Sequence, residues 1–396
     1  MKILVINCGS SSLKFEFFKT GKELTSLAEG LIDRIGESDC KFTFKSSDKN
    51  LGIKNKVRNH TEAVKLTFDV LKKTQVLTSN KEIDLIAHRV VHGGEKYSKP
   101  TVIDAQVIKE IKKLSGLAPL HNPINLEGIL ACKKILPRTK QIAVFDTAFN
   151  QTMEEKAFMY AIPQEFYKKQ GIRRYGFHGT NHQYVTDTAT KLLGNKPNLK
   201  IISCHLGNGS SITASIGGKV VDTSMGFTPL EGIPMGSRSG SIDPAIILKI
   251  QEIKKLTPKR TDEFLNKECG LRGLSGISSD MREIYDASLK KDKNAILTID
   301  LLSYQIAKYI GAYSASLNGL DALIFTGGMG EKAFYIREKA CSYLNHLGLI
   351  LEKFKNQKNE QMISDRKSKI KVFVIKADEE YQIAKSAISR QNKTKF

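Results

Sequence analysis

Three turns rich in glycine and serine follow apolar stretches of the chain, and their residue types suit the binding of phosphate. They are Asn7–Ser12, Gly207–Ser211 and Gly327–Gly330. A turn without bulky side chains lets several backbone N–H groups point at one anion, and serine hydroxyls add donors. One such turn is also found in ordinary hairpins, but three of them favour nucleotide binding. The sequence has neither a GxxxxGK[ST] nor a GxGxxG motif, which excludes a P-loop and a dinucleotide fingerprint.

Several arginine, aspartate and histidine residues lie at strand ends or in loops, where open α/β sheets usually have their functional residues. Arg89 lies at the end of an apolar strand, and Asp146 ends another such strand. His121 is bracketed by two prolines, and His178 by two glycines. Arg238 lies in a glycine- and serine-rich loop with no helical or strand pattern. A lone arginine or histidine in a strand is often only a hydrogen-bonded core residue, so their number favours an anion site.

The elements that position these residues repeat along the chain. Lys2–Ile6 and Leu13–Phe18 read as strands on either side of the first turn, the second of them half-buried by its alternation. Lys200–Cys204 and Ile212–Ile216 flank the second turn in the same way. Two strand–turn–strand units, one in each half, predict duplicated domains.

A second repeat supports an α/β fold. Two further apolar strands are predicted at Asp84–Ala87 and Asp321–Phe325, and another at Ile142–Phe145, after which a domain boundary near Asn150 is expected. Helical periodicity alternates with the strands, which is typical of an α/β architecture. The predicted helices are Thr61–Lys73, Asp104–Lys113, Asn294–Leu317, Ala333–Leu347 and Glu380–Arg390.

Composition narrows the class of protein. With 396 residues, 40% hydrophobic and 26% charged, the chain can form two globular domains, and a cytoplasmic location is expected. The six cysteines are scattered without a CxxC pair, which argues against a zinc site or a disulfide framework. The net charge of +21 raises the alternative of nucleic-acid binding. The lysines are spread along the chain without a basic tail, so a solvated surface that attracts anionic substrates is favoured.

The sequence resembles the acetokinase (acetate kinase) family, within the superfamily of sugar kinases, Hsp70 and actin. The resemblance covers essentially the whole chain and implies two actin-like (ribonuclease H-like) domains with an active-site cleft between them. The expected bounds are 1–150 with 381–396, and 151–380 for the nucleotide-binding domain, which is also expected to dimerise. The motifs that carry the resemblance are Asn7–Lys14, His88–Gly94, Phe145–Phe149, Tyr175–Thr180, His205–Gly209, Met225–Gly232 and Phe325–Glu331.

The resemblance also implies roles for single residues. Arg89 and Arg238 would hold the acetate carboxylate and the migrating phosphoryl group, with Asp146 in support. His121 and His178 would donate to the transition state. The other implied residues are Asn7 and Glu379 for Mg²⁺ (or Mn²⁺); Val91, Leu120, Phe177 and Pro229 for the acetate methyl group; and Lys14, His205, Leu206, Gly207, Asn208, Gly209, Asp280, Met281, Arg282, Gly327, Gly328, Met329, Gly330 and Glu331 for the nucleotide.

The expected reaction is direct in-line transfer of the γ-phosphoryl group of Mg-ATP to acetate, by a homodimer that binds neither nucleic acid nor membrane. Three positions depart from the usual family pattern: Asn181, Ser241 and the pair Ala377-Asp378 ahead of Glu379. Two alternatives stay open: a propionate or butyrate kinase, and an actin- or Hsp70-like nucleotide-dependent binding module without small-molecule chemistry.

Overall fold

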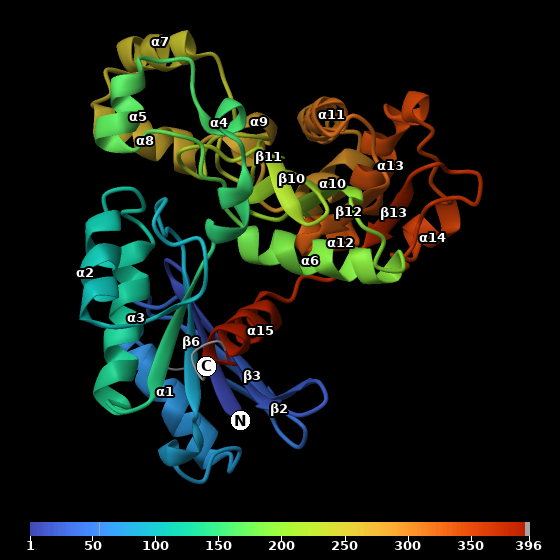
Figure 1. The fold of residues 1–396 in the computed structure, drawn as a ribbon. Helices are drawn as coiled ribbons and strands as arrows, with labels where there is room; N and C mark the ends of the chain where they lie inside the picture. Colours follow the sequence, from blue (N-terminus) through green and yellow to red (C-terminus); the bar gives the residue numbers. More distant parts are fainter. Residues whose placement is uncertain (55, 393–396) are drawn as a thin grey trace. The chain divides into compact units, whose positions relative to one another are not determined.

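The computed structural model describes residues 1–54 and 56–392 and divides the chain into two compact units (Figure 1). Unit 1 comprises Met1–Ala148 and Asp378–Phe396, and unit 2 comprises Phe149–Ala377. The bounds expected from the sequence, 150 and 380, lie a few residues from these junctions. In the described part of the chain, no helix has both the length and the apolar character that a bilayer crossing requires.

Unit 1 is built on a mixed sheet of eight strands in the order β5-β4-β3-β2-β1-β6-β8-β7. β1 pairs antiparallel with β2 and parallel with β6, which in turn pairs parallel with β8. The strands are β1 (Lys2–Cys8), β2 (Ser12–Thr20), β3 (Leu24–Asp33), β4 (Lys41–Ser46), β5 (Asn50–Lys54), β6 (Leu85–Val90), β7 (Thr101–Val102) and β8 (Lys140–Phe145).

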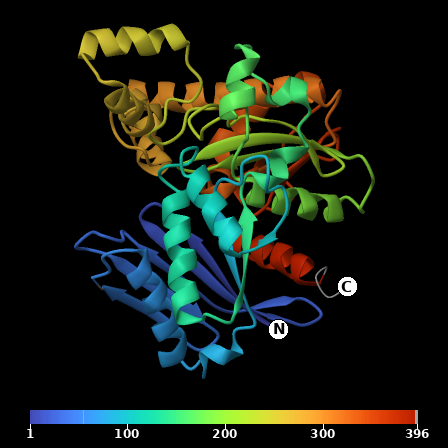
Figure 2. The same cartoon turned by 60° about the vertical axis from the view of Figure 1, so that its left-hand side comes forward.

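Helices cover both faces of this sheet (Figure 2). On one face α1 packs against β2, which contributes Leu13, Phe15 and Phe17 to the core, and α3 packs against β1 and β6; on the other face α15 packs against Phe18 of β2. The alternation in β2 therefore predicted the strand correctly but not its half-buried state, because the last helix of the chain covers the second face. The helices of unit 1 are α1 (His60–Lys73), η1 (Asn80–Glu82), α2 (Ala105–Leu114), α3 (Asn122–Ile135) and α15 (Glu379–Asn392).

Unit 2 has a five-stranded sheet in the order β11-β10-β9-β12-β13. Its strands are β9 (Lys200–Leu206), β10 (Ser210–Ile216), β11 (Lys219–Thr223), β12 (Ala322–Thr326) and β13 (Lys371–Val374). β9 pairs antiparallel with β10 and parallel with β12, and β12 pairs parallel with β13. This order repeats β3-β2-β1-β6-β8 of unit 1, strand for strand and with the same directions, so the predicted duplication is confirmed.

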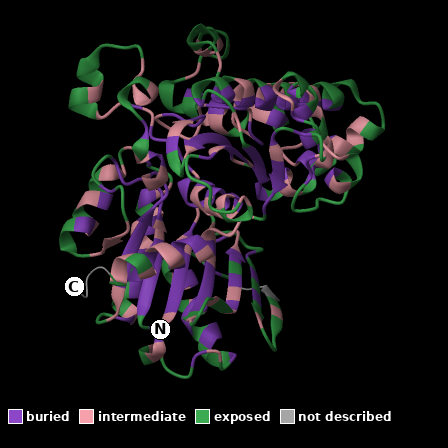
Figure 3. Cartoon of the chain, turned by 45° about the vertical axis from the view of Figure 1, so that its right-hand side comes forward, coloured by how far each residue is buried: buried purple, intermediate pink, exposed green. Residues whose placement is uncertain are grey.

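The helices of unit 2 divide between the two faces of its sheet. α6 packs on one face through Val185 and Ala189, and α11 packs on the other through residues such as Leu302 and Ile306. The sheets are the most deeply buried parts of both units (Figure 3). The helices are η2 (Ala148–Thr152), α4 (Glu155–Phe158), α5 (Gln164–Gln170), α6 (Gly179–Leu192), α7 (Pro244–Lys254), α8 (Pro258–Lys267), α9 (Gly270–Ser275), α10 (Met281–Leu289), α11 (Lys293–Ser316), α12 (Gly327–Lys332), α13 (Phe334–Ser342), η3 (Asn345–Leu347) and α14 (Lys353–Gln357).

Two sequence predictions need correction in the region after β12. The turn at Gly327–Gly330 is the first part of the short helix α12, which Gly327 enters with φ of 78°. The helix expected at Ala333–Leu347 begins at Phe334 as α13 and is interrupted after Ser342, because Tyr343 and Leu344 separate α13 from η3. The apolar periodicity of the sequence continues from α13 into η3, which is why the two elements were predicted as one helix.

Candidate functional site

Arg89 and Asp146 form an ion pair at the carboxyl ends of two neighbouring parallel strands of unit 1. Arg89 Nη2 donates to Asp146 Oδ2 at 2.8 Å, and Asp146 is completely buried. Arg89 Nε lies 3.9 Å from Glu379 Oε2 at the start of α15. Burial opposes the charge of Arg89, but Asp146 and Glu379 outweigh it and raise the pKa of the guanidinium. Within the described residues Nε has no hydrogen-bond acceptor, so this donor is left for a ligand.

Two asparagines on α3 fix the backbone just after Arg89. The Asn122 side chain accepts from His92 N at 3.0 Å and donates to His92 O at 3.0 Å. Asn125 accepts from Val91 N at 2.9 Å and donates to Cys8 O at 2.8 Å. These amides replace the ladder hydrogen bonds that are lost where β6 ends. The sequence analysis missed both, although they follow His121 on the same helix.

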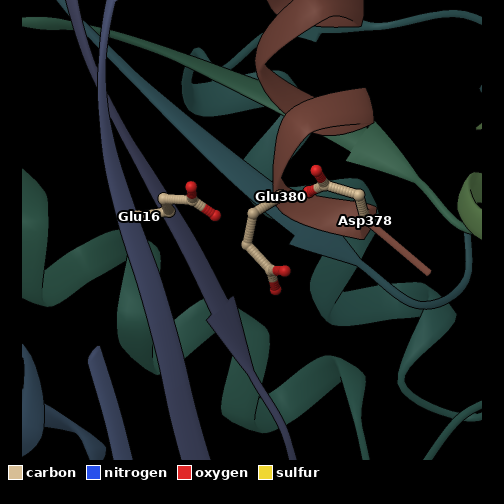
Figure 4. Close-up of side chains that lie close together, drawn as sticks. All are labelled: Glu16, Asp378 and Glu380. Atoms are coloured by element: carbon tan, nitrogen blue, oxygen red, sulfur yellow. The ribbon is translucent and has the colours of Figure 1, made fainter. Parts of the chain in front are cut away.

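The carboxylates at the start of α15 gather with Glu16 of β2 (Figure 4). One oxygen of each of Glu16, Asp378 and Glu380 lies within 4.8 Å of the others. Glu380 accepts from Asn7 Nδ2 at 2.9 Å and forms an ion pair with Lys14. Burial raises the pKa of Glu16 to about 7. Three carboxylates around one lysine leave negative charge in excess, which suits a bound cation.

Glu379 and Asn7, the residues expected to hold Mg²⁺, border this cluster. Burial raises the pKa of Glu379 to about 7 despite the opposing charge of Arg89. Asn7 Nδ2 donates a hydrogen bond to Glu380, so the side-chain oxygen of Asn7 is the atom that would coordinate a cation. Hard oxygen ligands of this kind fit Mg²⁺. Lys14, expected at the nucleotide, is instead engaged with Glu380, and its contact with a nucleotide stays a prediction.

A pocket of about 690 Å³ lies in unit 2 at the residues predicted to bind the nucleotide. Its volume is in the range that small-molecule ligands occupy. Seven of its lining residues come from the sequence prediction: Gly207, Asn208, Asp280, Met281, Arg282, Gly328 and Met329. Seven others were missed: Ser279, Tyr285, Asp286, Lys332, Ala333, Phe334 and Tyr335.

Two of the missed residues form an aromatic wall of this pocket. The rings of Tyr285 and Tyr335 are stacked, with centroids 3.7 Å apart and planes within 6°. Tyr285 follows Met281 by one helical turn of α10, a spacing that was available in the sequence. A flat aromatic surface is suited to stacking against a nucleotide base.

Four side chains of unit 2 form a hydrogen-bonded row ending at His178. His182 Nδ1 lies 2.7 Å from Ser203 Oγ, and its Nε2 lies 2.7 Å from Ser211 Oγ. Ser211 Oγ is in turn 2.9 Å from His178 Nδ1. His178 has a positive φ of 57°, a strained value that is common at functional sites. The row fixes the ring of His178, and the sequence analysis did not identify His182.

His205 stacks on His178, with ring centroids 4.2 Å apart. Asn181 Nδ2 lies 2.7 Å from His205 Nδ1. An amide N–H donated to Nδ1 makes that nitrogen an acceptor, so the proton of the neutral ring lies on Nε2. Asn181 is one of the three departures from the family pattern, and here it sets the tautomer of a predicted nucleotide-binding residue.

Arg238 lies beside His178 and Gly209. A Cβ atom placed on Gly209 would be 3.5 Å from both Arg238 Nη1 and His178 Nε2. Among the residues that the structure describes, the guanidinium donates to the Pro229 carbonyl at 3.4 Å and to the Met235 sulfur at 3.8 Å. No carboxylate in the described ranges lies within ion-pair distance of it, and burial lowers its pKa. A partly buried cation without a counter-ion is suited to holding an anionic ligand.

The residues expected to surround the acetate methyl group are divided between the units. Val91 and Phe177 are buried, whereas Leu120 is 56% exposed and Pro229 is half-buried. His121 is the residue before α3, with Pro123 at the second helical position. Leu206 is buried within the sheet of unit 2. The contribution of these residues to a substrate site stays a prediction.

The chain is similar to known proteins in both sequence and fold. A model of the acetokinase family matches residues 2–385. The chain is 49% identical to an acetate kinase of Thermotoga petrophila over 393 residues, 97% of each chain. It superposes on the crystal structure of the Porphyromonas gingivalis acetate kinase with a TM-score of 0.90 at 41% identity, covering 98% and 99% of the two chains. A Francisella tularensis propionate kinase gives a TM-score of 0.91 at 42% identity, over 97% and 98% of the chains.

Proposed function

Since the chain belongs to the acetokinase family, we propose that the charged clusters of its two units carry out that family's reaction, the phosphorylation of acetate. The enzyme is a phosphotransferase with a carboxyl group as acceptor, and ATP is its co-substrate. The proposal concerns which residues perform the transfer and how.

The observation that carries the proposal is the guanidinium of Arg238 beside His178 and Gly209, which has no carboxylate partner among the described residues. Acetate is ionised at pH 7, so no general base is needed to activate it. The task of the protein is to position two anions and to neutralise the charge that builds up between them. A guanidinium meets carboxylate and phosphoryl oxygens through two parallel N–H groups, which a lysine cannot do. This arrangement supports direct in-line transfer of the γ-phosphoryl group from ATP to an acetate oxygen.

The other polar residues support this transfer. Arg89 offers its remaining donor to the anionic substrate, while Asp146 holds the guanidinium in place. His178, fixed through Ser211, would donate a hydrogen bond to the migrating group, and His121 would do the same. Preorganised donors of this kind stabilise a transition state without the cost of reorganisation.

Mg²⁺ would be held by Asn7 and Glu379, with the neighbouring carboxylates supplying negative charge. When bound, the ion would neutralise the phosphate oxygens of ATP. The position of Glu379 supports this role, because a half-buried carboxylate at the edge of an acidic cluster, with a raised pKa, is stabilised by a cation.

Acetate is the acceptor that the proposed methyl-group residues Val91, Leu120, Phe177 and Pro229 suit. Propionate is the second candidate, because a propionate kinase is among the similar structures. One additional methylene changes binding by about 1–3 kcal/mol, so overlapping use of the two acids is expected.

The proposal includes a homodimer in the cytoplasm, where ATP is consumed and regenerated. The helix α7 has no buried residue, and it exposes Ile246, Leu248 and Ile253 on unit 2. Such an apolar helix is suited to contact with a second copy. Measuring the solution mass, with Leu248→Asp as the variant, tests this part.

The test of the catalytic assignment is acyl phosphate formation by Arg238 variants. Arg238→Ala and Arg238→Lys are expected to lower kcat by about 10²–10³, because neither offers the forked guanidinium. Arg366→Ala, which removes an exposed arginine of the same unit, is the matched control and should retain full activity. Normal turnover by both Arg238 variants would contradict the assignment.

A further inference from the structure

The chain passes from unit 2 back to unit 1 between Ala377 and Asp378. β13 has ended at Val374, and Ile375 N still donates to Phe325 O at 3.0 Å. Ala377 N donates to Glu331 Oε1 at 2.9 Å. From Asp378 onward the contacts belong to the first turn of α15, where its side chain accepts from Tyr381 N at 3.1 Å. In the described part of the chain, Glu331 is therefore the side chain of unit 2 that accepts a hydrogen bond from Ala377, the last residue before the junction.

The same oxygen of Glu331 also holds the beginning of α12. Gly327 N donates to Glu331 Oε1 at 3.1 Å. Gly327 enters the helix with φ of 78°, and a Cβ atom there would lie 2.8 Å from Leu206 O. One carboxylate oxygen thus joins two backbone segments that are fifty residues apart in sequence. Hydrogen bonds from N–H groups to an ionised carboxylate are stronger than neutral ones.

α12 lies between the nucleotide pocket and this junction. Gly328, Met329 and Lys332 of α12 line the pocket, whereas Glu331 is not among its lining residues. Glu331, which the family resemblance counts among the nucleotide ligands, is thus directed to the backbone of its own unit. A ligand that restrains Gly328 and Met329 also restrains the helix that carries Glu331.

We propose that Glu331 is a positioning residue that couples occupancy of the nucleotide pocket to the placement of Ala377 and, through the chain, of Glu379. Glu379 follows Ala377 by two residues, so holding the Ala377 amide limits where α15 and its first carboxylate begin. This inference rests on the proposed function in taking the pocket as the ATP/ADP site and Glu379 as a cation ligand. A carboxylate that only stabilised α12 would need the Gly327 bond but not the Ala377 bond.

Amide hydrogen exchange tests the coupling without turnover and without metal. The full chain is compared as wild type, Glu331→Ala, Glu331→Gln and the control Glu338→Ala, an exposed glutamate on α13, each with and without ADP. Losing a hydrogen bond to a charged group is expected to speed exchange of the Ala377 and Gly327 amides by about 10- to 100-fold in Glu331→Ala. Glu331→Gln keeps an acceptor oxygen and should fall between this variant and the wild type.

ADP should slow exchange at Ala377 in the wild type and in Glu338→Ala, but not in Glu331→Ala, although ADP still binds to that variant. The coupling would be overturned if ADP slowed exchange at Ala377 equally in Glu331→Ala and in the wild type. It would also be overturned if, without ADP, the Ala377 amide exchanged at the same rate in these two proteins. If the wild type binds ADP and forms acetyl phosphate but Ala377 does not respond to ADP, the coupling fails while the proposed function stands. If the wild type does not bind ADP, the proposed function fails, and the coupling fails with it.

Discussion

The two arginines proposed to hold the substrates should differ sharply in what they contribute to stability. Arg89 neutralises the completely buried Asp146 at 2.8 Å. Replacing Arg89 by Met removes the ion pair of that buried carboxylate, which costs about 3–5 kcal/mol of unfolding free energy. In the described part of the chain, the Arg238 side chain donates hydrogen bonds to a carbonyl at 3.4 Å and to a sulfur at 3.8 Å. Replacing it by Met should cost less than about 1 kcal/mol, because its charge is already disfavoured by burial.

Urea unfolding followed by circular dichroism measures this difference, and the acyl phosphate assay is run on the same samples. Both variants should lose about 10²–10³ in kcat, while only Arg89→Met loses stability. The double variant Arg89→Met/Asp146→Leu should recover much of the lost stability, because the buried charge that Arg89 neutralises is removed as well. Equal destabilisation by the two single variants, or no recovery in the double variant, would refute the reasoning.

Three further predictions concern a buried arginine, a buried histidine and the aromatic pair of the pocket in unit 2. Arg337→Met should lower the unfolding free energy by about 3 kcal/mol in denaturation experiments, because the buried guanidinium donates four hydrogen bonds, two of them to the buried Asn356. Burial lowers the pKa of His88 to about 4, so the stability from its neutral ring is present above pH 6.5 and is lost as the pH falls towards 4. The stability advantage of the wild type over His88→Gln should therefore shrink by about 3 kcal/mol between pH 7 and pH 4. Tyr285→Ala and Tyr335→Ala should raise KM for ATP by about 10-fold, with KM for acetate unchanged, as initial-rate kinetics can measure.

Each of these three predictions would be contradicted by a specific result. A wild-type unfolding midpoint for Arg337→Met would show that its acceptors find other partners. A constant difference between wild type and His88→Gln across the pH range would mean that His88 titrates normally in the folded state. Equal effects of the tyrosine variants on both KM values would show that the aromatic pair is a packing feature of unit 2.

The sequence predicted the fold well because its signals are local. Alternating and apolar runs located β1, β2, β6, β9, β10 and β12, and the repeated order of strands and turns predicted the duplication. It could not predict that α15 buries the second face of β2, because that contact joins segments more than 350 residues apart. The end of α13 at Ser342 was missed for a different reason, since the apolar period continues into η3.

The site was predicted in part for the same physical reasons. Arg89 and Asp146 end neighbouring parallel strands, so their meeting followed from the fold. The cluster of Glu16, Asp378 and Glu380 did not, because it joins β2 to the start of α15. The row that orients His178 joins two strands to one helix, and its serines look like ordinary strand residues in the sequence.

The measurement that tests the central claim most directly is a hydroxamate assay of acyl phosphate with ATP, Mg²⁺ and a series of carboxylates. The account predicts acyl phosphate formation that depends on the carboxylate, with kcat/KM for acetate about 10-fold or more above that for propionate and lower still for butyrate. Hydrolysis of ATP that neither depends on a carboxylate nor yields an acyl phosphate would contradict it.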